Sequence, residues 1–133
     1  MLLANAHPDL KLSFLWLSLG CVMVALVVYL SLTSSPVDTG LSFPYQDKVF
    51  HAFAYFVLMT WFAQIYHGRF QRNLIAVMLV IMGVMLEYLQ SFDPNRFYEY
   101  ADMFANSTGV VLGLLVTLTW VKNCLIRFEK LIR

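Results

Sequence analysis

An uncharged apolar run from Leu12 to Leu32 constrains the fold of this chain more than any other sequence feature. Its length of about 20 residues matches the thickness of the hydrocarbon layer when the run is helical. Three shorter apolar runs follow, at about residues 49–66, 74–89 and 103–121. We therefore predict an all-α, polytopic membrane protein, a single domain over residues 1–133 whose four transmembrane helices form an antiparallel bundle.

The composition favours the same fold class. Hydrophobic residues make up 60% of the chain and charged residues 13%, whereas soluble domains carry about 25% charged residues. A cleaved signal peptide is the alternative reading of the first run, because Lys11 precedes it and Ser34 and Ser35 follow it. The apolar region of a signal peptide is about 7–15 residues long, so we favour an uncleaved helix.

The distribution of basic residues predicts the orientation, because loops rich in Lys and Arg stay on the cytoplasmic side. The N-terminal tail, the connection between the second and third runs and the C-terminal tail lie on one side. That side carries Lys11, Arg69, Arg72, Lys122, Arg127, Lys130 and Arg133, and the other side only Lys48 and Arg96. We expect both termini to be cytoplasmic.

This topology brings polar side chains from separate segments to the outer ends of the last three helices. The predicted ligand-binding set is Asp47, Lys48, His51, Tyr55, Glu87, Gln90, Arg96, Asp102 and Asn106. Charged groups near hydrocarbon normally face the interior of a bundle, a partner or water. We expect Lys48 or Arg96 to pair with Glu87, Asp47 or Asp102, and Asn106 to complete the remaining hydrogen bonds.

The same set leaves two classes of function open, a binding site and a membrane-embedded enzyme. A histidine with carboxylates can perform general acid–base chemistry, and the candidate catalytic residues are His51, Glu87 and Asp102. The spacing is not diagnostic of a metal, and we assign neither a metal nor a cofactor. No basic cluster with interleaved aromatic residues is present, so we do not expect a nucleic-acid partner.

Two further patterns leave alternatives open. Gly109 and Gly113 form a GxxxG pattern, which lets helix backbones approach closely, either within the bundle or in a homo-oligomer. The basic tail from Lys122 to Arg133 has apolar residues between its charges. It either lies along the inner leaflet as a short amphipathic helix or extends the fourth span.

Taken in order, these residues resemble the signature of VanZ-like membrane proteins. The matching elements are Asp47-Lys48-x-x-His51-x-x-x-Tyr55, Glu87-x-x-Gln90, Arg96, and Asp102-x-x-x-Asn106-x-x-Gly109-x-x-x-Gly113, with Ser34-Ser35-Pro36 after the first span. The resemblance covers roughly residues 12–120. Residues 97–101 are more aromatic than the usual pattern of the family.

The resemblance implies a multi-pass protein of the bacterial cytoplasmic (inner) membrane with a role in the cell envelope. The founding member of the family is associated with resistance to the glycopeptide antibiotic teicoplanin. The implied partners are membrane lipid and a lipid-linked envelope precursor or a lipoglycopeptide. Binding or shielding of an envelope component is the first hypothesis, and an enzyme acting on a lipid-linked envelope substrate is the alternative.

Overall fold

The computed structural model describes residues 5–34 and 40–133, and every regular element within them is a helix. The helices are α1 (Ser13–Leu32), α2 (Gln46–Ile65), α3 (Arg69–Gln90), α4 (Tyr100–Val116), the short 3-10 helix η2 (Trp120–Asn123) and α5 (Cys124–Ile132). The predicted all-α class is confirmed. Ser35 and Pro36, which contribute to the VanZ-like pattern, lie outside the described residues.

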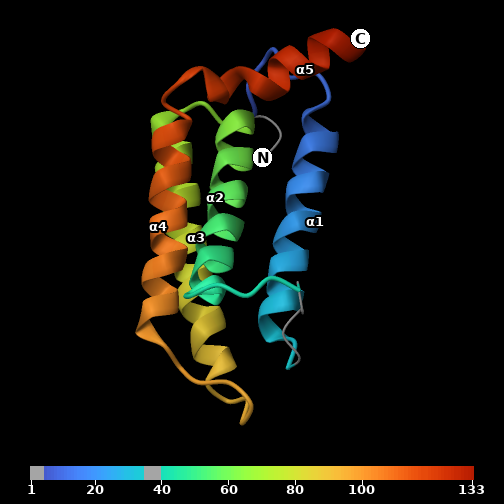
Figure 1. The fold of residues 1–133 in the computed structure, drawn as a ribbon. Helices are drawn as coiled ribbons and strands as arrows, with labels where there is room; N and C mark the ends of the chain where they lie inside the picture. Colours follow the sequence, from blue (N-terminus) through green and yellow to red (C-terminus); the bar gives the residue numbers. More distant parts are fainter. Residues whose placement is uncertain (1–4, 35–39) are drawn as a thin grey trace.

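The first four helices run alternately up and down, and α5 lies across one end of them (Figure 1). Among them α1, α2 and α3 are long and apolar enough to cross a membrane. Helix α4 and the segment Trp120–Ile132 pass the same test as a pair, although they are bent by 78°. The structure therefore offers three spanning helices, or four if the bent pair counts as one span.

Helix α4 ends at Val116, five residues before the predicted end of the fourth span at residue 121. The hydroxyl groups of Thr117 and Thr119 donate to the carbonyl oxygens of Leu114 and Val116, and such bonds compete with the helical ladder. The tail then turns into η2 and α5, where Leu125, Ile126 and Glu129 are buried on one face while Arg127 and Lys130 are exposed. The tail is thus a separate amphipathic helix and not a straight extension of α4.

Three helices begin earlier than the apolar runs predicted, and α4 is one of them, since it starts at Tyr100 instead of residue 103. Helix α2 starts at Gln46 instead of residue 49, and α3 at Arg69 instead of residue 74. The first turns of α2 and α3 are mostly polar, which hides them from a search for apolar residues. Asp47 suits the first turn of α2 because a carboxylate is stabilised by the positive end of the helix dipole.

Close packing between α2 and α4 depends on the two glycines of the GxxxG pattern. A Cβ atom on Gly109 would collide with the carbonyl oxygen of Ala52, and one on Gly113 would lie 2.8 Å from the Cβ atom of Met59. The glycine face of α4 is therefore covered by α2 of the same chain. A homo-oligomer built on that face would have to displace α2.

Helix α1 is tied to the bundle at the end where α5 lies. Gly20 leaves room for the ring of Phe62, and the indole of Trp61 donates to the carbonyl oxygen of Trp16. The buried carboxylate of Glu129, on α5, accepts hydrogen bonds from the backbone N–H of Leu12 and from the indole of Trp16. One side chain thus satisfies free donors at the start of α1 and holds α5 against it.

We predict that Gly109→Ala destabilises the protein by about 1–3 kcal/mol, because the added methyl group meets backbone and not a movable side chain. The matched control is Gly83→Ala, where the nearest atom is Nδ2 of Asn106 at 3.1 Å. There a gain in helix propensity of about 1 kcal/mol opposes the milder contact. Thermal unfolding in detergent measures both variants, and equal stabilities would contradict the close α2–α4 contact.

Candidate functional site

A groove of about 780 Å³ opens at the end of the bundle opposite α5, between the last turns of α1, the first turns of α2 and residues 96–102. Six of the nine predicted site residues line it: Asp47, His51, Tyr55, Gln90, Arg96 and Asp102. Lys48, Glu87 and Asn106 contribute from positions behind this lining. The structure thus brings side chains from α2, α3, α4 and the α3–α4 connection to one place.

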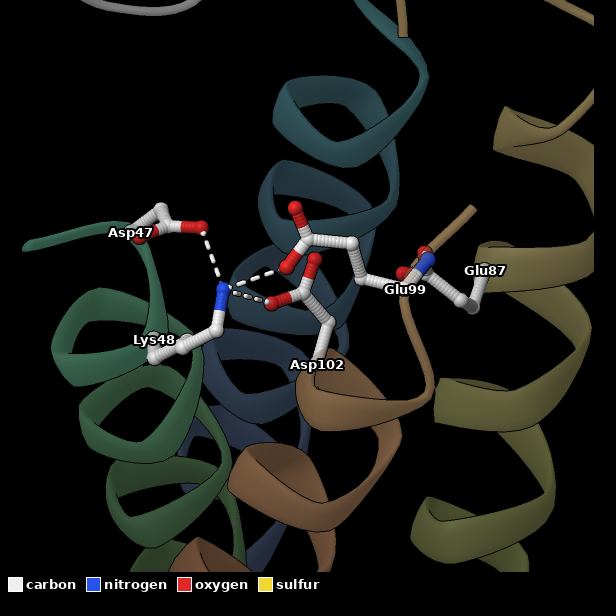
Figure 2. A network of polar contacts seen from close by, with 5 residues as sticks. All are labelled: Asp47, Lys48, Glu87, Glu99 and Asp102. Atoms are coloured by element: carbon white, nitrogen blue, oxygen red, sulfur yellow. Dashed lines mark hydrogen bonds and ion pairs between the residues drawn. The ribbon is translucent and has the colours of Figure 1, made fainter. Parts of the chain in front are cut away.

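Lys48 is the centre of an ion-pair network at the mouth of the groove (Figure 2). Its ammonium nitrogen lies 3.0 Å from a carboxylate oxygen of Asp47 and 3.3 Å from one of Asp102. It also forms an ion pair with Glu99, which precedes α4. The predicted pairing of Lys48 with Asp47 and Asp102 is confirmed. Three carboxylates around one ammonium leave the network with excess negative charge.

Glu87 supports this network from α3 without lining the groove. Its side chain is 1% exposed, and Oε1 accepts a hydrogen bond of 3.0 Å from the backbone N–H of Glu99. That bond fixes the residue whose own carboxylate reaches Lys48 (Figure 2). The contacts of Glu87 are those of a positioning residue.

Two polar side chains connect the groove to the C-terminal end of α1. Gln90 donates from Nε2 to the carbonyl oxygen of Ser31 over 2.6 Å, and Arg96 donates to the carbonyl oxygen of Thr33. The last carbonyl groups of a helix have no partner within it, and cations are favoured there. Arg96 therefore binds the end of α1, and of the two expected alternatives it is Lys48 that pairs with the carboxylates among the described residues.

The turn that carries Arg96 is held by Asp93. Its carboxylate accepts a hydrogen bond of 2.9 Å from the backbone N–H of Asn95, and this bond lowers the pKa of Asp93. The backbone N–H of Arg96 donates to the carbonyl oxygen of the same aspartate. The guanidinium is thus presented by a hydrogen-bonded turn.

Several buried polar atoms in this region have no hydrogen-bond partner among the described residues. They are the hydroxyl of Tyr55, Nε of Arg96, Oδ1 of Asp102 and Oδ1 of Asn106. Oδ1 of Asp102 is close enough to Lys48 for an ion pair but lacks hydrogen-bond alignment. Buried polar groups normally find partners, and those without one often mark a site for water, an ion or a ligand.

The carboxylates could in principle hold a metal ion. One oxygen each from Asp47, Glu99 and Asp102 lies within 4.8 Å of the others, and hard divalent cations prefer such oxygen ligands. The ammonium of Lys48, however, already pairs with all three groups. Among the described residues this ammonium takes the place of a metal ion, but its single positive charge does not balance three carboxylates.

His51 lines the groove, and no hydrogen bond joins its imidazole to the described part of the chain. General acid–base catalysis by a side-chain pair is recognised by a base held and oriented by a neighbour. The structure shows no such pair for His51.

Sequence reasoning missed part of the site. Glu99 was not placed in it, although it lies three residues before Asp102 and precedes the same helix. The contribution of α1 through Leu30 and Ser31 was also missed, because that helix carries no charge to attract attention. The aromatic wall, which includes Phe50 and Phe97, gave no separate signal within a chain rich in aromatic residues.

The chain is similar to an uncharacterised protein of the fission yeast Schizosaccharomyces pombe. The two sequences are 31% identical over 116 residues, which is 85% of this chain and 68% of the yeast protein. The chain belongs to the family of this yeast protein. No protein-family model matches the chain, and no solved structure matches it.

We predict that Lys48→Met lowers the free energy of unfolding by about 1.5–3 kcal/mol, the range for hydrogen bonds to charged groups. The substitution keeps the length of the side chain but leaves the three carboxylates to repel one another. Adding Asp102→Asn removes part of that repulsion, so the double variant is expected to be more stable than Lys48→Met alone. Denaturation in detergent compares the two, and a less stable double variant would contradict the charge network.

Proposed function

We propose that this chain is a four-span membrane protein whose groove binds the polar headgroup of a membrane amphiphile. The observation that carries the proposal is the groove itself, which combines the Lys48 network with an apolar wall. Val27, Leu30 and Phe50 line it beside Asp47 and Asp102. Such a mixture fits a molecule with a charged head and a hydrocarbon tail, because binding pockets are mostly apolar with few polar groups that fix orientation.

The proposed orientation has both termini in the cytoplasm and the groove on the opposite face. The excess of Lys and Arg on the loops at the α5 end supports this arrangement. Residues 7–12 and α5 lie together at that end, where the backbone N–H of Lys11 donates to Glu129. The fourth crossing is then α4, with α5 on the membrane surface, and the groove opens to the outer leaflet.

The resemblance to VanZ-like proteins supports a narrower proposal, in which the amphiphile is an envelope component whose binding alters access of teicoplanin in a bacterial cytoplasmic membrane. The yeast relative comes from a eukaryote. We therefore rank the general function, binding of a membrane amphiphile, ahead of one tied to a bacterial wall.

The alternative proposal is an acid–base enzyme acting on a lipid-linked substrate in the same groove. His51 and Asp102 line the groove and support it. Glu87, the third candidate, is buried behind the lining and engaged by the backbone of Glu99. Turnover of a lipid-linked substrate that is lost in His51→Ala would favour the enzyme over the binding protein.

Photo-crosslinking tests the general proposal. We expect p-benzoylphenylalanine in place of Phe50, which lines the groove, to capture one class of amphiphile in cells. The matched control is the same amino acid in place of Phe53, which lies on the same helix, is 63% exposed and does not line the groove. It is expected to capture bulk lipid. Mass spectrometry identifies the adducts, and identical lipid mixtures at both positions would contradict selective binding.

Binding of fluorescent teicoplanin to whole cells tests the narrower proposal. Expression of the wild-type chain in a glycopeptide-susceptible bacterium is expected to reduce binding, and Asp102→Asn to restore it at matched membrane levels. Asp9→Asn is the control, because Asp9 lies at the other end of the bundle. Unchanged binding in all strains would separate the groove from the drug phenotype.

A further inference from the structure

The charges that line the groove are of both signs. Asp47, Glu99 and Asp102 supply carboxylates, Arg96 supplies a guanidinium, and all four line the same space. We propose, on the basis of the proposed function, that the groove recognises a headgroup in which an ammonium is joined to a phosphate. The ammonium lies at the carboxylates and the phosphate at Arg96, as a phosphoethanolamine or phosphocholine group allows.

The carboxylates have capacity for a second cation. The side chains of Asp47 and Glu99 are 58% and 46% exposed, so both keep oxygen surface beyond their contact with Lys48. The position of Lys48 shows that an ammonium fits among these oxygens. Phe43 and Phe50 line the same groove, and their rings pack edge to face with centroids 6.3 Å apart. Aromatic faces attract ammonium groups.

The phosphate half has donors that the fold leaves unused. One terminal nitrogen of Arg96 donates to the carbonyl oxygen of Thr33, while the buried Nε has no partner among the described residues. The hydroxyl of Tyr55 is also without a partner there, although the residue is 1% exposed and lines the groove. Guanidinium groups bind phosphate oxygens through paired hydrogen bonds, so these two donors suit an anion.

Neither charge alone fits the groove as well as the pair. A lone anion at Arg96 would face the excess negative charge of the three carboxylates. A lone cation would leave Nε of Arg96 and the hydroxyl of Tyr55 buried without acceptors, which is unfavourable for any buried donor. A zwitterion places a positive charge beside the carboxylates and supplies acceptors for Arg96 and Tyr55.

Four probes with the same dodecyl chain separate these possibilities. They are dodecylphosphocholine, which carries both charges, dodecyltrimethylammonium, dodecyl phosphate, and additional dodecyl maltoside as the neutral case. The full chain is immobilised in dodecyl maltoside micelles, and the retained fraction of each labelled probe is measured. We expect dodecylphosphocholine to be retained about tenfold more strongly than either singly charged probe, a free-energy difference of about 1.4 kcal/mol.

Two substitutions assign the halves of the headgroup. Glu99→Gln is expected to reduce retention of dodecylphosphocholine and dodecyltrimethylammonium about tenfold and not to weaken that of dodecyl phosphate. Arg96→Gln is expected to reduce the retention of dodecylphosphocholine to that of dodecyltrimethylammonium. Asp47→Asn is a second charge deletion at an exposed side chain, in case one variant fails to fold. Asp9→Asn, an exposed change at the other end of the bundle, is expected to retain all probes as the wild type does.

The outcomes distinguish the two proposals. If dodecyl phosphate or dodecyl maltoside is retained best, and the groove variants change that retention, the proposal of a zwitterionic headgroup is overturned. The proposal that the groove binds an amphiphile then still holds. Equal retention of all probes, insensitive to every variant, would overturn both proposals. Free phosphocholine tests the source of the headgroup. Binding as tight as that of dodecylphosphocholine would keep the headgroup chemistry but overturn the membrane amphiphile in favour of a soluble ligand.

Discussion

The contact between α2 and α4 determines the geometry of the rest of the molecule. Gly109 and Gly113 let the two helices approach until backbone meets backbone at Ala52. Both helices start at the same end of the bundle (Figure 1), so this approach brings their first turns together. Lys48 can pair with Asp102 only because of it. A larger residue at either glycine would act on the charge network, although Gly109 and Gly113 lie seven and eleven residues from Asp102 in the sequence.

Much of the site could be predicted from the sequence, because the number of helices that precede a polar residue determines at which end of the bundle it lies. Alternating helices bring the start of α2, the end of α3 and the start of α4 to one end of the bundle, so Asp47, Gln90 and Asp102 meet without any knowledge of packing. Which residue bonds to which could not be predicted. Arg96 reaches the carbonyl oxygen of Thr33 because α1 ends beside it, and nothing in the spacing specifies that neighbour.

The helix ends show the other limit of sequence reasoning. Apolar runs locate the middle of each helix, since lipid contact requires them there. The ends are set by local hydrogen bonds, such as those of Thr117 and Thr119 that stop α4. They are also set by long-range ones, such as the bond from Leu12 to Glu129, which joins residues 117 apart in the sequence. Nothing in the sequence of the basic tail indicates that Glu129 forms hydrogen bonds with the start of α1.

The early end of α4 has a consequence for the surrounding bilayer. Seventeen residues rise about 25 Å as a helix, less than the hydrocarbon layer of about 30 Å. Helix α3, with 22 residues, rises about 33 Å. In the proposed four-span arrangement, the membrane is thinner beside α4 than beside α3, or the helices tilt, because unequal hydrophobic lengths are accommodated in these two ways. Local thinning would draw in the interface at the end where α4 stops, beside η2 and α5 and opposite the groove.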